Sequence, residues 1–261
     1  MKDTVKIIAR KDLKVILQEK IIWLPMLIVP LLLCLLLPVI FFIAAGSAES
    51  IKELESLPFE FEGEAANFNP AQKSIYFAIN YMFPGLFLII PILTSSIIAG
   101  SSFVGEREGK TLESLFYTPV TIRELFTAKL TGSFVIAYSV TFISFTLFSI
   151  VVFTAQFFYF DYIIYPSFKW LVFIFWLCPA LILLGLIFMV RTSAKAKTFQ
   201  EAQQRVLLLI LPVILIIIGQ VAGLFYLSTL VMLITGLLIF IIDYLIMRAA
   251  IKNFKPENLV F

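Results

Sequence analysis

The chain has 261 residues, of which 61% are hydrophobic and only 14% are charged, with a formal net charge of +3. A soluble domain cannot bury so large an apolar fraction, so the composition excludes a soluble globular protein and predicts a polytopic membrane protein. Histidine is absent and the two cysteines lie in apolar runs, which argues against His-based metal sites, triads, zinc sites and disulfide frameworks.

The first twenty residues predict a helix that lies along the membrane surface. Basic residues recur every four positions and therefore share one helical face, opposite an apolar stripe. This pattern is typical of a helix on an anionic membrane surface. A short solvated segment leading into the first span is the alternative. The basic residues are Lys2, Lys6, Arg10 and Lys14.

Apolar runs of membrane-spanning length predict six transmembrane helices in a single domain that covers residues 1–261. The uncharged stretch 206–242 is too long for one span, and polar and glycine residues near Gly219–Ser228 predict a tight hairpin there. Prolines interrupt the first two spans, which a membrane helix tolerates when neighbouring groups satisfy the freed carbonyls. The predicted spans are about 21–45, 76–104, 130–153, 171–190, 206–222 and 226–247.

Six spans place both termini on one side of the membrane. Seventeen Lys and Arg residues then lie on that side, and only Lys52, Lys73 and Lys169 lie on the other. By the positive-inside rule the terminal side is the cytoplasm, which predicts a cell-membrane protein with both termini cytoplasmic. The acidic segment 49–73 is then an outer loop, either a solvated connection or a region that attracts cations to a pathway mouth.

Two features inside the spans are candidates for function. Small residues cluster in the second half of span two, including Ser95, Ser96 and Ser101, and either permit close helix packing or line a substrate path. Asp243 is an acid near the end of span six, and an intramembrane acid is a functional candidate by default. A structural role near the interface, paired with a cation, is the alternative for Asp243.

The polar segment 100–129 separates two uncharged runs and must lie outside the bilayer. Thr111 can cap a short helix that is ended by Pro119. Such a short amphipathic element at the membrane surface suits docking on a soluble partner. Its apolar side carries Leu112, Leu115 and Phe116.

The same segment contains a superficial match to a phosphate-binding loop at Gly105–Thr111. That loop needs four residues between its glycines, whereas three separate Gly105 from Gly109. Glu106 and Glu108 would also repel phosphate. The chain is therefore not predicted to bind nucleotide.

The segment Gly105-Glu-Arg-Glu-Gly-Lys-Thr-Leu-Glu-Ser-Leu, followed by Thr118-Pro-Val and Glu124-Leu, resembles the cytoplasmic loop of ABC-2 type transporter permeases. The opening Arg10-Lys-Asp-Leu-Lys is also similar to that family. Lys197-Thr-Phe-Gln-Glu-Ala-Gln-Gln resembles the sodium-efflux branch, although this chain lacks the large outer domain of many members of that branch.

The resemblance implies a coupling helix between spans two and three that sits in a groove on an ABC ATPase. It also implies two ATPase subunits, which bind ATP and Mg, and a second permease copy that forms a homodimer or a paralogous heterodimer. No catalytic, cofactor or metal residue and no nucleic-acid partner is expected in this chain. By position, the coupling residues are Glu106, Glu108, Leu112 and Glu113, with Leu115 and Phe116 on the apolar side.

A permease of an ATP-driven exporter is the predicted function. The spans contain few fixed charges, which favours a hydrophobic or amphipathic substrate such as a peptide, an antibiotic or a lipid-like compound. The alternatives are a sodium-efflux permease and an ATP-independent secondary transporter or channel. A secondary transporter needs an ion-coupling site near the midplane, often on broken helices, and the interrupted spans one and two keep that alternative open.

Overall fold

A computed structural model of the chain describes residues 14, 18, 20–45, 63–105, 122–160, 164–193, 198–222, 224 and 226–253. All regular structure in these ranges is helical, and six helices are long and apolar enough to cross a membrane, which confirms the predicted all-α polytopic fold. We call them spans one to six. They cover Trp23–Ala44, Pro70–Val104, Thr127–Tyr159, Phe168–Ser193, Phe199–Gln220 and Thr229–Arg248.

Most spans are built from several consecutive helical elements. In chain order these are α2 (Lys20–Leu31), η1 (Leu32–Leu36), α3 (Leu37–Ala44), η2 (Gly63–Asn67), α5 (Pro70–Phe77), η3 (Ala78–Met82), α6 (Phe83–Phe87), α7 (Ile89–Gly100), η4 (Ser101–Gly105), α10 (Ile122–Tyr159), α11 (Phe168–Val172), η5 (Phe173–Leu177), α12 (Cys178–Ser193), α13 (Phe199–Val206), η6 (Leu207–Leu209), α14 (Ile210–Val221) and α15 (Thr229–Asn253).

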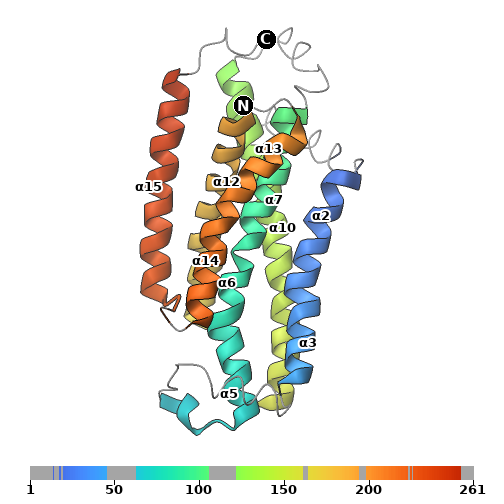
Figure 1. Cartoon of the computed structure of the whole chain (residues 1–261), viewed down its shortest axis with the longest axis vertical. Helices are drawn as coiled ribbons and strands as arrows, with labels where there is room; N and C mark the ends of the chain where they lie inside the picture. Colours follow the sequence, from blue (N-terminus) through green and yellow to red (C-terminus); the bar gives the residue numbers. More distant parts are fainter. Residues whose placement is uncertain are drawn as a thin grey trace.

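Span two lies at the centre of the bundle, and its α7 contacts α2, α10, α12, α13 and α14. Its most apolar window is 78% buried, whereas that of span six is 17% buried. Figure 1 shows α2 and α15 at opposite edges of the bundle. We call the end where α2 begins and α15 ends the proximal end, and the end where α5 lies the distal end. The peripheral helices expose apolar faces, as expected for lipid-facing surfaces.

A π-helical turn precedes a proline in three of the spans. Proline has no backbone N–H and its ring clashes with the carbonyl four residues earlier, so the regular hydrogen-bond pattern cannot continue there. In each case the residue before the proline donates instead to the carbonyl five residues earlier, which is the π-helical pattern. These donations run from Leu37 to Leu32, from Phe83 to Ala78 and from Cys178 to Phe173, before Pro38, Pro84 and Pro179.

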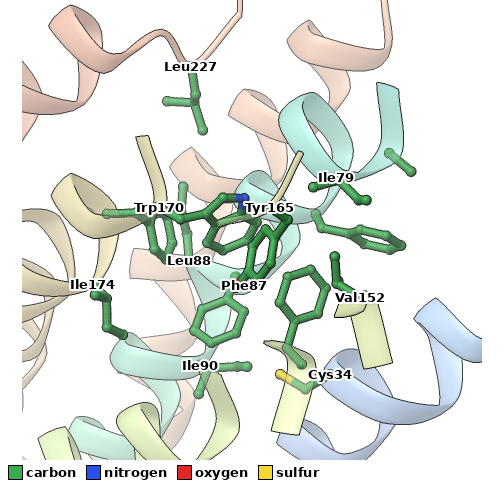
Figure 2. Packing of buried hydrophobic residues seen from close by; sticks show 14 of the residues in the cluster. Cys34, Ile79, Phe87, Leu88, Ile90, Val152, Tyr165, Trp170, Ile174 and Leu227 are labelled. Carbon is green, nitrogen blue, oxygen red and sulfur yellow. The ribbon is translucent and has the colours of Figure 1, made fainter. Parts of the chain in front are cut away.

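Aromatic side chains form the distal half of the core. Trp170 is 1% exposed, and its ring centroid lies 5.0 Å from that of Phe148 and 5.4 Å from that of Phe173. Figure 2 shows Trp170, Tyr165 and Phe87 grouped together, with Cys34 of span one at the edge of the cluster. The proximal half of the core is aliphatic and joins α7, α10, α12 and α13. The large rings therefore tie spans one to four together at the distal end.

Helical structure extends beyond the predicted spans into polar sequence. The second span begins at Pro70, whereas the sequence predicts a start near residue 76. Asn69 accepts a hydrogen bond from the Gln72 N–H (2.8 Å), and the Gln72 side chain accepts one from the Asn69 N–H (3.0 Å), so the two form a capping box. The Gln72 amide also donates to the carbonyl of Tyr159, the last residue of α10.

The predicted interfacial helix at residues 1–20 lies outside the described residues, apart from Lys14, Gln18 and Lys20, which are helical. The segment 191–205, which lies between the predicted spans four and five, is partly helical, because Thr198 caps α13 and the chain continues through η6 into α14. At the predicted hairpin between spans five and six, α14 ends at Val221 and α15 begins at Thr229.

Candidate functional site

The candidate coupling residues Glu106, Glu108, Leu112, Glu113, Leu115 and Phe116 all lie outside the described residues. Their role therefore stays a prediction. The two flanks of this segment are described, since span two ends in η4 at Gly105 and α10 begins at Ile122. The structure therefore shows the two helix ends that this segment connects.

Lys129 joins the two flanks of the candidate coupling segment. Its side chain is 3% exposed, and the ammonium group donates to the carbonyl of Ser102 at 2.7 Å and lies 5.3 Å from the centre of the Phe103 ring. The last carbonyls of a helix lack intrahelical partners and carry partial negative charge, so they favour a cation. Lys129 therefore fastens the start of span three to the end of span two.

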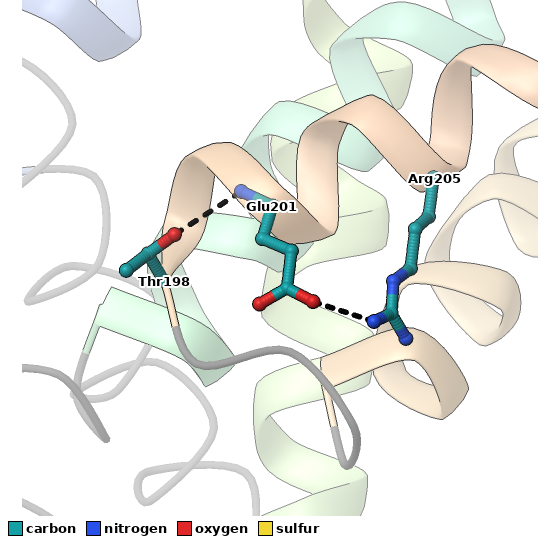
Figure 3. A network of polar contacts seen from close by, with 3 residues as sticks. All are labelled: Thr198, Glu201 and Arg205. Carbon is teal, nitrogen blue, oxygen red and sulfur yellow. Dashed lines mark hydrogen bonds and ion pairs between the residues drawn. The ribbon is translucent and has the colours of Figure 1, made fainter.

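The amphipathic helix α13 packs against the same end of span two. A Cβ atom added at Gly100 would lie 2.6 Å from the Phe199 ring, so the helix approaches the end of α7 closely because residue 100 has no side chain. Figure 3 shows that the Thr198 hydroxyl accepts from the Glu201 N–H (3.2 Å) and that Glu201 pairs with Arg205 (2.5 Å). The cap and the i,i+4 ion pair hold α13 in helical form in polar surroundings.

The small residues of span two are buried in helix packing. The Ser95, Ser96 and Ser101 hydroxyls donate to the carbonyls three residues earlier in their own helix, at 3.1, 2.8 and 2.9 Å. A Cβ atom added at Gly185 of α12 would lie only 2.1 Å from the Ser95 oxygen. Small side chains on both helices permit this approach, which supports the packing interpretation of Ser95.

Asp243 lies on the face of α15 that packs on span four. Gly236 lies two turns earlier on the same face of α15. A Cβ atom added at Gly236 would lie 2.6 Å from the Trp176 ring of span four. The Trp176 indole N–H also donates to the Leu233 carbonyl at 3.1 Å. The Asp243 side chain is 3% exposed, and neither carboxylate oxygen has a hydrogen-bond partner among the described residues. Asp243 thus remains the acid of functional interest, and the described residues offer no cation paired with it.

A polar group at the distal end was not singled out from the sequence. Lys169, the second residue of α11, donates to the backbone carbonyl of Asn80 and lies 4.7 Å from the centre of the Tyr81 ring. The sequence signal is Pro84, which stands four residues after Asn80 and cannot donate to its carbonyl. From the sequence one can predict the free carbonyl, but not which residue of another span reaches it.

The described residues contain no group of three or more His, Cys, Asp or Glu side chains that could hold a metal ion. Cys34 and Cys178 are both buried free cysteines.

Six apolar helices with polar segments at the proximal end define a multi-pass membrane protein. The family model described as ABC-2 family transporter protein matches residues 6–254, and the chain belongs to this family. The family comprises transport membrane subunits that work with an ABC ATPase, so membership implies that partner. None of the curated proteins and none of the solved structures matches the chain.

Proposed function

We propose that this chain is one permease of an ATP-driven exporter that moves a hydrophobic or amphipathic substrate out of the cell. The observation that carries the proposal is the family match over residues 6–254, together with six spans that contain few fixed charges. In this proposal two permease copies and two ATPase subunits form the transporter, and the ATPase subunits bind ATP and Mg. The excess of Lys and Arg on the terminal side supports a cytoplasmic location for the proximal end.

Residues 105–129 transmit the movement of the ATPase to the membrane helices. The hydrogen bond from Lys129 to the Ser102 carbonyl supports this role, because displacement of the segment pulls on the end of span two. Span two is the central helix of the bundle and contacts α10, α12 and α13. The packing of Phe199 on Gly100 couples α13 to the same helix end.

The ATPase contact is tested by substitutions in the candidate coupling segment. Buried apolar anchors dominate such interfaces, so Leu112→Ala or Phe116→Ala is expected to weaken ATPase binding by about 1–3 kcal/mol. Glu106→Lys combined with Glu108→Lys is expected to slow assembly with the ATPase and increase its salt sensitivity. Charges at the rim of an interface mainly affect the rate at which the two proteins associate. The measurement is the dissociation constant of the purified permease and ATPase.

Phe59→Ala serves as the matched control, because position 59 is an aromatic residue in the loop predicted on the opposite side. This variant should bind the ATPase normally. If the three coupling variants bind the ATPase and transport substrate like the unmodified protein, residues 105–129 only connect two spans. If no ATPase copurifies with the chain at all, an ATP-independent transporter or channel replaces the exporter.

The partner permease is expected to contact span one or span five. Only 22% of the apolar window is buried in each of these spans, so both leave an apolar face for a second copy. Cys34 cannot report on this contact because it is fully buried within its own chain. Cysteines at Ile40 or Leu215, which are exposed, should give crosslinked dimers in a background without Cys34 and Cys178. An active complex with a single permease chain would contradict this arrangement.

Sodium efflux is a second candidate function, and the buried carboxylate of Asp243 favours it. A sodium ion requires several converging oxygen ligands, of which this carboxylate supplies two. Sodium-stimulated ATP hydrolysis with a matching sodium flux in proteoliposomes would establish this function. Its absence, with export of an amphipathic compound, would support the first proposal.

A further inference from the structure

The π-helical turn η4, at the proximal end of span two, has no proline to explain it. The other three π-helical turns of the described residues each end two residues before a proline. η4 ends at Gly105, whereas position 107 is an arginine and the next proline in the sequence is Pro119. Because a π-helical turn is rarer and less regular than an α-helical turn, a contact from another element must favour it here.

Lys129 of α10 provides such a contact. Its ammonium group donates to the carbonyl of Ser102, inside η4, at 2.7 Å, and it lies 5.3 Å from the centre of the Phe103 ring. In a regular α-helix the carbonyl of residue 102 accepts from the N–H four residues later. A charged donor forms the stronger hydrogen bond and competes with that N–H group, and a side chain inserted in this way disturbs the helical pattern.

The contact depends on the relative position of two spans. Lys129 belongs to span three and is 3% exposed, whereas Ser102 belongs to span two and is 4% exposed. η4 also contacts α12 and α13, so it is enclosed by other helices. A movement of the start of span three away from span two therefore removes the ammonium group from the Ser102 carbonyl.

The change from a π-helical to an α-helical turn has a defined geometric result. A π-helical turn contains one residue more than the α-helical turn that replaces it, so the change rotates the residues at its end by up to about 100°. Val104 lies near this end, is 0% exposed and belongs to the aliphatic core of the proximal half. Ala99 is also 0% exposed but precedes η4. The change would therefore turn Val104 out of its contacts and leave Ala99 in place.

We infer that η4 is a conformational switch, which is π-helical while Lys129 donates to the Ser102 carbonyl and becomes α-helical when Lys129 withdraws. The switch deepens the proposed function, on which its use in coupling rests. Movement of the segment between spans two and three displaces the start of α10 and with it Lys129. The end of span two then rotates, and the movement is passed to the central helix of the bundle.

The test measures the rate at which a thiol reagent labels a cysteine at position 104. The protein is the purified permease with Val104→Cys in a background without Cys34 and Cys178, and the reagent is N-ethylmaleimide. Labelling should be slow in this protein, because position 104 is buried. Adding Lys129→Met should raise the rate about tenfold, since the hydrogen bond from a charged donor is lost. Labelling of Ala99→Cys should remain slow with either residue at position 129.

Arg107→Pro distinguishes a switch from simple fraying of the helix end. It supplies a proline at the spacing of Pro38, Pro84 and Pro179, and a proline at that spacing favours the π-helical turn. Adding Arg107→Pro to Lys129→Met should therefore return the labelling rate of position 104 to its original value. Arg107→Ala is the matched control and should leave the rate high.

Three results would overturn the switch. These are an unchanged rate with Lys129→Met, an equal rise at positions 99 and 104, and a rate that stays high when Arg107→Pro is added. In the complex with the ATPase, ATP should raise the rate at position 104, and Arg107→Pro should prevent this rise. No response to ATP in an assembled complex would overturn the use of the switch in coupling. Failure of the unmodified chain to bind any ATPase would instead contradict the proposed function, and labelling of the permease alone would still decide the switch.

Discussion

The close approach of spans two and four at Gly185 and Ser95 provides a quantitative test of their packing. Replacing Gly185 with alanine places a Cβ atom 2.1 Å from the Ser95 oxygen and 3.3 Å from the Ile92 carbonyl oxygen. The first distance is far below van der Waals contact, so either Ser95 rotates or the helices separate. The Ile92 carbonyl belongs to the backbone and cannot rotate away. Gly185→Ala is therefore expected to lower the free energy of unfolding by about 1–3 kcal/mol.

A double-mutant cycle with Ser95 isolates the cause of that loss. Ser95→Ala alone removes one hydrogen bond to the Ile92 carbonyl and should cost about 0.5–1.5 kcal/mol. In the double variant the 2.1 Å contact no longer exists, although the Ser95 Cβ atom is still 3.3 Å from the added atom. The double variant should therefore lose about 1–2 kcal/mol less than the sum of the single losses.

The assay is equilibrium unfolding in mixed micelles, followed by circular dichroism as a denaturing detergent is added. Ser96→Ala is the matched control, since the Ser96 hydroxyl makes the same kind of hydrogen bond, to the Leu93 carbonyl, but does not meet Gly185. It should not reduce the cost of Gly185→Ala. Additive losses from Gly185→Ala and Ser95→Ala would refute the close approach as the reason for the glycine.

Three further substitutions test other contacts. Lys129→Met should lower the unfolding free energy by about 1.5–3 kcal/mol, because the Ser102 carbonyl loses a charged donor. ATP-driven transport should also fall. Unchanged stability would refute the link between the end of span two and the start of span three. Trp176→Phe removes the donor to the Leu233 carbonyl and should cost about 1 kcal/mol in the same unfolding assay, with no effect on ATPase binding. Asp243→Asn should not lower the unfolding free energy, since the carboxylate has no partner among the described residues, whereas a loss above about 1 kcal/mol would reveal a structural contact.

The class of protein follows from the amino-acid sequence because hydropathy is a property of each local stretch of chain. Uncharged runs separated by charged segments predict six spans, and the described part of the chain contains six helices that could cross a membrane. The hairpin between spans five and six follows in the same way from polar and glycine residues. The ends of the spans are less predictable: Asn69 and Gln72 form a capping box, so α5 begins in polar sequence that hydropathy assigns to a loop.

The residues of the candidate site are also recognisable from the sequence, whereas their surroundings in the structure are not. The segment 105–129 is recognisable from its order of charged and apolar residues, and the matching family model supports that resemblance. Ser95 and Asp243 are also visible in the sequence, as a small residue and an acid within apolar runs. Their surroundings are not, because hydropathy does not state which helix faces them. Only the structure places Ser95 against Gly185 and leaves Asp243 buried on the face of α15 that packs on span four.

What the sequence alone determined is the number of spans, the polar segment between spans two and three, and the prolines that interrupt the helices. The absence of an N–H at Pro84 makes the Asn80 carbonyl available whatever the surroundings are. Only the tertiary structure decided that Lys169, 89 residues away, donates to that carbonyl, and that the Gln220 side chain packs against Gly85. The physical reason is that hydrogen bonds and close packing between helices depend on their mutual rotation and depth, which arise when side chains from all spans pack together.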